Sequence, residues 1–316
     1  IVCGGIWLQT YAIGKLVLPG TDEGVYLYAA KLVSQGYLIY RDFFLIHLPF
    51  WIYINSLILS MLGWNMDLFH LIYSAYVVTA VIPIYLIVYR KTKNVMAASM
   101  AAIIYLSFPQ AMEWDAHFFA MRQASLPLLG WALYHLEISK KYLWGGIFLA
   151  LFSIGLVTNI FMAILIIVAW SFFCSIESGH INITPTFKRV VVQISAPYVA
   201  IVGVYFVVVG AIPNFYPNVV GYQLANKAVP FLSRIEYLWE MLPLNWVIEL
   251  GGIVGGVVAP KSMKFLTLSI VLSLLTIVFL SRTFYPHYIV VLGVPWAILA
   301  GFLLDKILGF GLRKIA

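Results

Sequence analysis

The chain has 316 residues, of which 63% are hydrophobic and only 10% are charged, and its mean hydropathy is +0.97. This composition excludes a water-soluble globular protein and indicates a polytopic membrane protein. A spanning helix needs about 20 apolar residues, so about ten spans leave no room for a separate soluble catalytic domain. The formal net charge of +7 comes from basic residues spread over short loops, which argues against a nucleic-acid-binding patch.

The sequence predicts an all-α fold in which residues 1–316 form one integral-membrane domain with about ten transmembrane helices. Residues 1–18 are the first predicted span. Because the chain opens on Ile1 without a charged segment, we expect the beginning of this span to be missing. A short helix should follow from Thr21 to Gly36, with one apolar stripe along it. The stripe consists of Val25, Tyr28, Ala29, Leu32 and Val33.

Further apolar segments continue along the chain. The first, residues 48–62, is too short to cross, so it and the preceding short helix are expected to lie in the membrane interface, 48–62 as an interfacial or re-entrant segment. Longer apolar segments predict spans at 68–89, 95–111, 123–139, 142–158, 160–176, 190–210, 246–259, 265–281 and 285–304.

Two long outer loops separate the predicted spans. Residues 19–66 form the first and carry an acidic motif, and residues 211–245 form the second. The second should contain two short helices, around Val219–Ala228 and Phe231–Met241. A loop of this length within a compact bundle is usually functional.

Basic residues predict the orientation of the chain because they gather at every second junction between spans. The junctions hold Arg90, Lys91, Lys93, Lys140, Lys141, Lys188, Arg189, Lys261, Lys264, Lys306, Arg313 and Lys314. The positive-inside rule places them in the cytoplasm, provided that segment 48–62 does not cross. Most acidic residues then lie outside, whereas Glu137, Glu177 and Asp305 stay inside. We therefore expect a multi-pass protein of the cell membrane with its acidic sites on the extracytoplasmic face.

Asp22 and Glu23 are the strongest candidate for chemistry. A structural interpretation is available, since Thr21 can cap the following helix and acidic residues in a first turn complement the helix dipole. A cap, however, needs one such group and not two carboxylates at a membrane boundary. The functional interpretation makes one of them a general base for an acceptor hydroxyl, while its neighbour binds the acceptor or a metal.

A second acidic site follows at Glu113, Asp115 and His117. These residues form either a solvated loop or a set of ligands for a divalent cation, because two carboxylates and an imidazole fall within five residues. The spacing matches no specific metal motif, so no metal site is assigned.

Cationic side chains on the same face are candidate ligands for a phosphate. Arg282 stands at the outer mouth of the last span, against the positive-inside trend, and His287 and Tyr288 follow it. A guanidinium or imidazolium group can hold a phosphate that departs with growing negative charge, and an interface anchor is the alternative. Arg41 and His47 are candidates for the same role.

Several other polar residues show no such pattern. Lys227 and Arg234 are weaker phosphate candidates, and His70, His135 and His180 are interpreted as packing or surface residues. Cys3 and Cys174 lie in apolar runs without partner spacing, so they are interpreted as small core residues.

The order of these motifs resembles a known family. Asp22-Glu23 after the first span, then Gly36 to Phe44 (Gly-x-x-x-Tyr-Arg-Asp-Phe-Phe), then a proline-containing motif before an apolar helix resemble the GT-C glycosyltransferases that depend on polyprenyl-phosphate sugars. The protein O-mannosyltransferase and lipid A aminoarabinose transferase group is the most similar. Arg282 to Pro295 also resembles a late motif of that group. The resemblance covers most of the chain in layout and about residues 1–50, 110–135 and 280–300 in motif.

The chain departs from the family pattern at two places. His47-Leu48-Pro49 stands where relatives often carry Lys-Pro-Pro, so the resemblance passes a phosphate-binding role to His47. Arg122-Gln123 stands where relatives carry a second aspartate before an apolar helix.

The resemblance implies a membrane glycosyltransferase that moves a hexosyl or pentosyl group from a dolichyl- or undecaprenyl-phosphate donor to an acceptor hydroxyl. Asp22 would be the base and Glu23 its neighbour in the acceptor site, in a single displacement that inverts the sugar carbon. The partners are the donor, a protein, lipid or glycan acceptor and membrane lipids. No cofactor is required, although a divalent cation is compatible with the acidic sites.

Two other classes compete with this interpretation. A transporter or flippase for a lipid-linked sugar would carry its charges near the membrane midplane and would show inverted repeats, and neither pattern is evident. A non-catalytic membrane partner, in which the acids only cap helices, would keep its activity when Asp22 becomes Asn.

Overall fold

The computed structural model describes residues 21–107, 121–177, 185–225, 229–276, 279 and 290–315. Over these ranges the chain is helical apart from its turns and loops, and the only β-type pairing is an isolated bridge between Ile39 and Phe43. The predicted all-α class is confirmed. In chain order the elements are α2 Thr21–Ser34, α3 Phe50–Met61, α4 Met66–Val78, α5 Val81–Thr92, α6 Val95–Leu106, α8 Met121–Glu137, α9 Tyr142–Ile154, α10 Val157–Glu177, α11 Pro185–Gly210, the π-helix η1 Tyr216–Gly221, α12 Tyr222–Ala225, α13 Phe231–Val258, the 3-10 helix η2 Lys261–Met263, α14 Lys264–Leu275 and α15 Gly293–Ile315.

The predicted spans fall on helices. Helices α4 and α5 are nearly continuous and together cover the predicted span 68–89. Four helical stretches in the described part of the chain are long and apolar enough to cross a membrane: Met66–Thr92, Val157–Ser175, Val191–Gly210 and Val290–Phe310. They confirm a polytopic membrane protein, whereas the number of about ten spans stays a prediction. The first predicted span, 1–18, lies outside the described residues.

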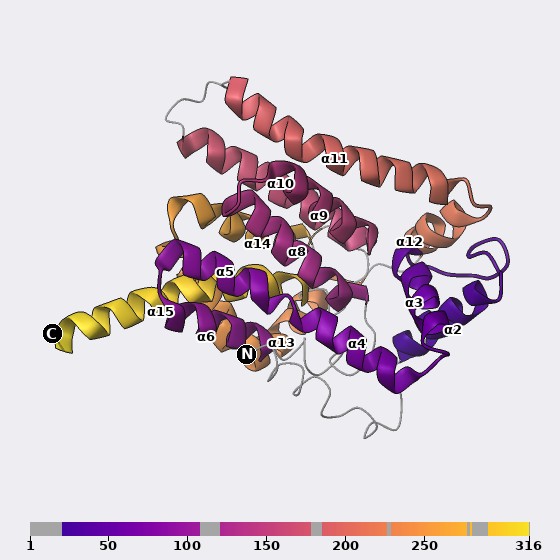
Figure 1. The fold of residues 1–316 in the computed structure, drawn as a ribbon, viewed down its shortest axis with the longest axis horizontal. Helices are drawn as coiled ribbons and strands as arrows, with labels where there is room; N and C mark the ends of the chain where they lie inside the picture. Colours follow the sequence, from indigo (N-terminus) through magenta and orange to yellow (C-terminus); the bar gives the residue numbers. More distant parts are fainter. Residues whose placement is uncertain are drawn as a thin grey trace.

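Buried apolar side chains form two clusters. The larger cluster joins α5, α6, α8, α9, α10, α14 and α15 into the main bundle. The smaller cluster joins α2, α3 and α4 to the start of α8 and to Phe215 and Val219 of the 211–225 segment. Figure 1 shows α2, α3 and α12 together at one end of the long axis, and the C-terminal part of α15 at the other. We call the first of these the α2 end and the second the basic end.

Glycines let two pairs of helices come close. A Cβ added to Gly255 in α13 would lie 2.0 Å from the carbonyl oxygen of Leu299 in α15. A Cβ added to Gly146 in α9 would lie 2.3 Å from the carbonyl oxygen of Ile194 in α11. Small residues at such crossings are typical of membrane helices, which associate by close packing and not by expelling water.

The face of α2 that is buried differs from the predicted apolar stripe. Of the stripe, Ala29 is buried, whereas Val25 and Tyr28 are 54% and 65% exposed, and the inward face holds Glu23 and Tyr26. At a membrane interface, exposed aromatic and aliphatic side chains can contact lipid, so this arrangement is compatible with the interfacial helix that the sequence predicts.

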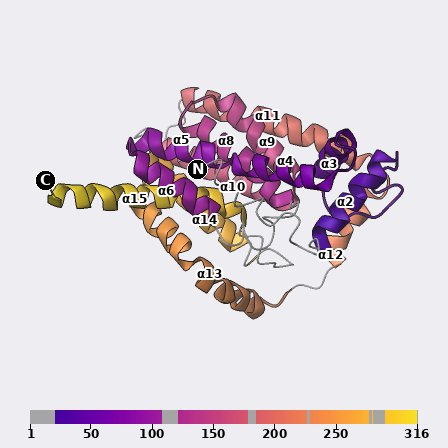
Figure 2. The ribbon, with the colours of Figure 1, turned by 60° about the horizontal axis from the view of Figure 1, so that its bottom comes forward.

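The second outer loop is also organised differently. The sequence predicts a short helix over Phe231–Met241 and a separate span from residue 246, but the structure has one continuous helix, α13, through residue 258. Residue 243, a proline, lies within this helix. Proline is tolerated inside membrane helices because neighbouring groups satisfy the freed backbone carbonyl. Figure 2 shows α13 beside α15 at one end and slanting away from the other helices towards its other end.

Polar contacts bring four of the basic junctions to the same end of the bundle. Lys91 Nζ donates to Glu137 Oε2 at 3.0 Å and to Ser262 Oγ at 2.8 Å. Asn94 Nδ2 donates to Asp305 Oδ1 at 3.1 Å. These contacts confirm that the junctions share one side, as the alternation of charges predicted. Which side of the membrane it faces stays a prediction.

Candidate functional site

A buried carboxylate and an imidazole meet at the start of α2. Glu23 Oε1 lies 2.8 Å from Nε2 of His70 in α4, and their side chains are 1% and 17% exposed. An ionised carboxylate only accepts hydrogen bonds, so the imidazole N–H is the donor. The first turn of α4 is held by its N-cap, where Asn65 Oδ1 accepts from the Leu68 N–H at 3.0 Å. The interpretation of His70 as a residue without a constellation was therefore wrong.

Asp22 lies one residue before Glu23, in the first turn of α2. This position is compatible with both interpretations drawn from the sequence, an acid that complements the helix dipole and a general base. An acidic residue in a first turn complements the helix dipole, and Asp22 also directly precedes the buried Glu23. The role of Asp22 as base stays a prediction.

His47 lies against the same face of α2, one turn further along. Tyr26 Oη lies 3.3 Å from His47 Nε2, and the two rings meet edge to face at 5.3 Å between centroids. The Tyr40 hydroxyl donates to the His47 carbonyl oxygen at 2.5 Å. Burial, together with the positive charge of Arg122, lowers the pKa of His47 to about 4. The imidazole is therefore neutral near pH 7 and offers a phosphate a hydrogen bond but no charge.

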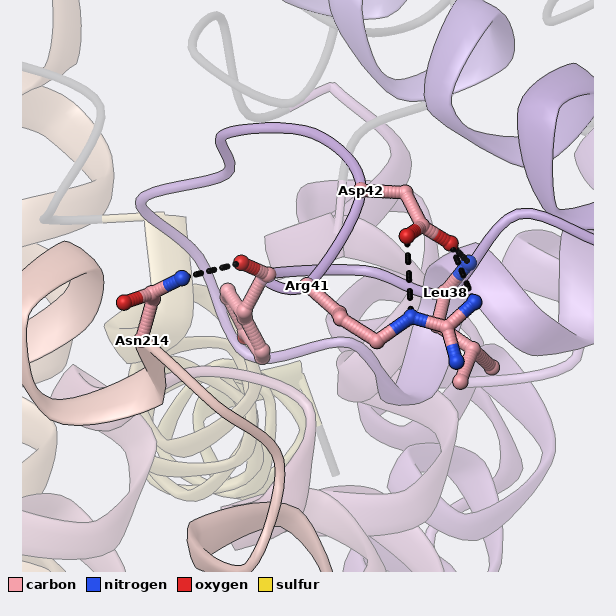
Figure 3. A network of polar contacts seen from close by, with 5 residues as sticks. Leu38, Arg41, Asp42 and Asn214 are labelled. Carbon is pink, nitrogen blue, oxygen red and sulfur yellow. Dashed lines mark hydrogen bonds and ion pairs between the residues drawn. The ribbon is translucent and has the colours of Figure 1, made fainter.

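The loop between α2 and α3 carries a second ion pair at its surface. The Arg41 guanidinium donates to both Asp42 oxygens, from Nε to Oδ1 at 2.8 Å and from Nη2 to Oδ2 at 2.7 Å. The Leu38 N–H also donates to Asp42 Oδ2 at 2.7 Å (Figure 3). The Arg41 hydrogen bonds and this N–H lower the pKa of Asp42 to about 2. Arg41 is half exposed, so it is accessible to a ligand, and its predicted role as a phosphate ligand stays untested.

The 211–225 segment packs on this loop. Asn214 Nδ2 donates to the Tyr40 carbonyl oxygen at 3.3 Å, which Figure 3 shows as the contact that crosses between the two segments. Phe215 meets the Tyr40 ring edge to face at 5.2 Å, and Tyr222 meets Phe44 in the same way at 5.8 Å. Tyr40 has φ of +68°, a left-handed backbone conformation that residues other than glycine rarely adopt, and these contacts hold Tyr40 in it. The two outer segments therefore form one unit.

The start of α8 is held against α3 and α4 by three hydrogen bonds. Trp51 Nε1 donates to Ser125 Oγ at 3.1 Å, Tyr73 Oη to Gln123 Oε1 at 3.3 Å, and Tyr76 Oη to the Ala124 carbonyl oxygen at 3.0 Å. Arg122 stands at this start, close enough for its charge to act on His47. The sequence identified Arg122 only as a departure from the family pattern. The structure adds it to the positive charge near the candidate site.

Several predicted site residues lie outside the described part of the chain: Glu113, Asp115, His117, Arg282, His287 and Tyr288, with Lys227 and His180. Their roles stay predictions. Within the described residues, no group of three or more His, Cys, Asp or Glu side chains is placed to hold a metal ion.

Two of the remaining candidates have local partners. Arg234 is buried and its Nε donates to the Val229 carbonyl oxygen at 2.8 Å, so part of its guanidinium is engaged with the backbone. His135 stacks on Phe148 and its Nδ1 lies 2.8 Å from Ser139 Oγ, which agrees with the packing role interpreted from the sequence.

The fold is that of a polytopic membrane protein and is similar to the GT-C fold. The solved structures to which it is similar are of ArnT from Cupriavidus metallidurans, a lipid A aminoarabinose transferase, one bound to undecaprenyl phosphate and one in the apo state. Their TM-scores are 0.67 and 0.61, each at 14% identity over 96% of this chain and 59% of the ArnT chain. No protein-family model and no curated protein matches the sequence. The chain thus spans about three-fifths of ArnT, and the resemblance read from its motifs is confirmed for the fold.

Proposed function

We propose that the protein is a membrane glycosyltransferase that moves a sugar from a polyprenyl-phosphate donor to an acceptor hydroxyl on the extracytoplasmic face of the cell membrane. The observation that carries this proposal is the buried Glu23–His70 pair, one residue from Asp22, within an ArnT-like fold. One of the two ArnT structures holds undecaprenyl phosphate, which supports a lipid-phosphate donor of the same chemical class.

Asp22 acts as the general base in this mechanism. The acceptor oxygen attacks the sugar carbon as its proton passes to the Asp22 carboxylate, while the bond from that carbon to the phosphate oxygen breaks. The phosphate leaves with the electron pair, and one displacement inverts the sugar carbon. A divalent cation has no required step.

Glu23 and His70 position Asp22. Consecutive residues on a helix are about 100° apart around its axis, so a side chain fixed at one position fixes the rotation of its neighbour. Glu23 is fixed by His70, and one turn later Tyr26 contacts His47. Two anchors one turn apart prevent α2 from turning about its axis, which keeps Asp22 at a constant place relative to α4.

Cationic groups near the site stabilise the departing phosphate. Arg122 at the start of α8 and the half-exposed Arg41 supply charge, and His47 supplies a hydrogen bond. Arg282, His287 and Tyr288 keep their predicted roles as further phosphate ligands.

The test compares the native protein with Asp22→Asn, purified in detergent, for transfer from labelled prenyl-phosphate hexoses and pentoses to a panel of acceptors. Asp67→Asn is the matched control, because Asp67 is an exposed acid in the first turn of the neighbouring helix α4. We expect transfer by the native protein and the control, and a loss of at least about 100-fold in Asp22→Asn at unchanged thermal stability. Full activity in Asp22→Asn would remove its role as base. Donor binding without turnover by the native protein would favour a flippase.

A further inference from the structure

The basic end of the bundle gathers cations from four separate parts of the chain. The turn between α5 and α6, the turn between α8 and α9, the junction between α13 and α14, and the second half of α15 meet there, opposite α2 and α3 (Figure 1). Five basic side chains at this end are exposed and form no ion pair with any described acid: Arg90, Lys93, Lys141, Lys261 and Lys306. We call these five residues the basic surface.

The acids whose side chains are described at this end are already engaged. Glu137 is buried and accepts from Lys91 Nζ at 3.0 Å and from Trp170 Nε1 at 2.7 Å, with Lys140 at 3.5 Å. Asp305 accepts from Asn94. A neutral amide leaves the charge of Asp305 in place, but Glu137 and Asp305 are two carboxylates against Lys91, Lys140 and the five exposed cations. The basic surface therefore keeps a net positive charge.

Two turns at this end place lysine in an unfavourable backbone conformation. Lys93 and Lys140 have φ of +59° and +53°; Lys93 directly follows α5, and Lys140 stands three residues after the last residue of α8. Glycine is the favoured residue at such a position because a side chain crowds the following carbonyl. Both ammonium groups lie back over the helix that they follow, since Lys140 Nζ is 3.5 Å from Glu137 Oε2 and Lys93 Nζ is 6.0 Å from the centroid of the Tyr89 ring.

Exposed apolar side chains follow both lysine turns immediately. Val95 and Met96 come directly after Lys93-Asn94, and Leu143 and Trp144 come directly after Lys141-Tyr142; all four are at least half exposed. Cations beside apolar and indole groups are arranged as a bilayer surface requires, with charge at the depth of the phosphates and apolar groups among the acyl chains.

We propose that the basic surface binds the phosphate headgroups of anionic phospholipids in the leaflet at this end of the protein. Lysine ammonium groups on flexible stems suit phosphates at variable positions, and Trp144 anchors the same region in the interface. The binding does not depend on sugar transfer, so it stands or falls separately from the proposed function.

The test uses the purified chain in phosphatidylcholine vesicles that contain a small fraction of one brominated lipid. In one set of vesicles this lipid is brominated phosphatidylglycerol, and in the other set it is brominated phosphatidylcholine. Bromine quenches the fluorescence of nearby tryptophan, and the difference between native protein and Trp144→Phe isolates the signal of Trp144. We expect stronger quenching by brominated phosphatidylglycerol, and a preference that weakens in high salt.

The charge is then removed at four exposed positions, Lys93, Lys141, Lys261 and Lys306. Each lysine near the surface contributes about fivefold to binding of an anionic leaflet, so substitution of all four by Gln should reduce the preference at least about fivefold. Substitution of the same four by Arg keeps the charge and should keep the preference, which also controls for folding. Equal quenching by both lipids in the native protein, or an unchanged preference in the Gln variant, overturns the proposal.

Discussion

Two buried carboxylates, one at each end of the bundle, differ in the groups that contact them. This difference distinguishes an acid that stabilises the fold from one in the candidate site. Glu137 at the basic end is 3% exposed and lies against two ammonium groups and an indole N–H. Glu23 at the α2 end is 2% exposed and meets an imidazole, which carries a charge only when it is protonated. The equally buried acids therefore differ in electrostatic compensation.

That difference has a physical consequence. The two lysines at Glu137 compensate the carboxylate charge, and its hydrogen bonds join the helices that supply the partners, here α5, α8 and α10. Glu23 instead contacts the imidazole of His70, and this contact joins α2 to α4. Glu137 is therefore assigned to stability, and Glu23 to the candidate site.

The largest expected effect is on stability, from removal of Glu137. Glu137→Ala leaves Lys91 partly buried without its anion, and loss of one partner of a buried pair costs about 3 kcal/mol. Thermal unfolding in detergent should show a midpoint several degrees lower, with transfer by the remaining folded protein retained. Asp305→Asn is the matched control because Asp305 is an acid at the same end that is only partly buried. Equal midpoints for both variants would contradict the assignment.

The next effect is on catalysis, from removal of the charge at Glu23. Glu23→Gln keeps the size of the side chain and a hydrogen-bonding contact with His70 but removes the anion beside Asp22. We expect kcat to fall by about 100-fold with a shift in midpoint under about 2 °C. A large loss of stability with normal kcat would place Glu23 in the same structural class as Glu137.

The helices themselves were largely accessible to sequence reasoning. The interfacial segment 48–62 corresponds to α3 at 50–61, and the predicted span 142–158 corresponds to α9 at 142–154. Both predictions rest on apolar runs between polar turns, which are local signals. The buried face of α2 is harder to predict. Apolar side chains on its outward side can contact lipid, so the sequence shows no contrast in hydrophobicity between the two sides of the helix.

The contacts of the candidate site were not accessible in the same way. Glu23 and His70 are 47 positions apart, and nothing in the local pattern of His70 marks it as a partner. Arg122 likewise becomes informative only once α8 is packed beside the 36–49 loop. Residues that act through tertiary packing need the fold, whereas Asp22 and Glu23 stood out because two adjacent acids interrupt an apolar sequence.

A smaller effect is expected from the partner of Glu23. His70→Ala removes the donor that fixes Glu23, and kcat should fall about tenfold, as for loss of one hydrogen bond to a charged group. His70→Gln keeps an N–H donor and should recover most of the activity. In a double-mutant cycle, His70→Ala should add little once Glu23 is already Gln, because both changes remove one interaction. Independent effects on kcat would show that His70 acts elsewhere.

The smallest effect concerns the pH dependence of stability at His47. Its pKa in the folded state, about 4, lies below that of the unfolded chain, so the unfolded state binds more protons between pH 6.5 and 4. Folding stability must therefore fall as the pH falls through this window. His47→Gln keeps a polar partner for Tyr26 but does not titrate, so its stability should depend less on pH.

The difference between native protein and His47→Gln should grow by about 1 kcal/mol from pH 7 to pH 5, because His47 is partly exposed and the full shift is not realised. Thermal midpoints measured at both pH values would register this as about 2 °C. Identical pH dependence in the two proteins would mean that His47 is hydrated and can become a cation. The α2 end would then hold an imidazolium that could bind phosphate by charge, and the contrast with the lysine-paired acid at the basic end would widen.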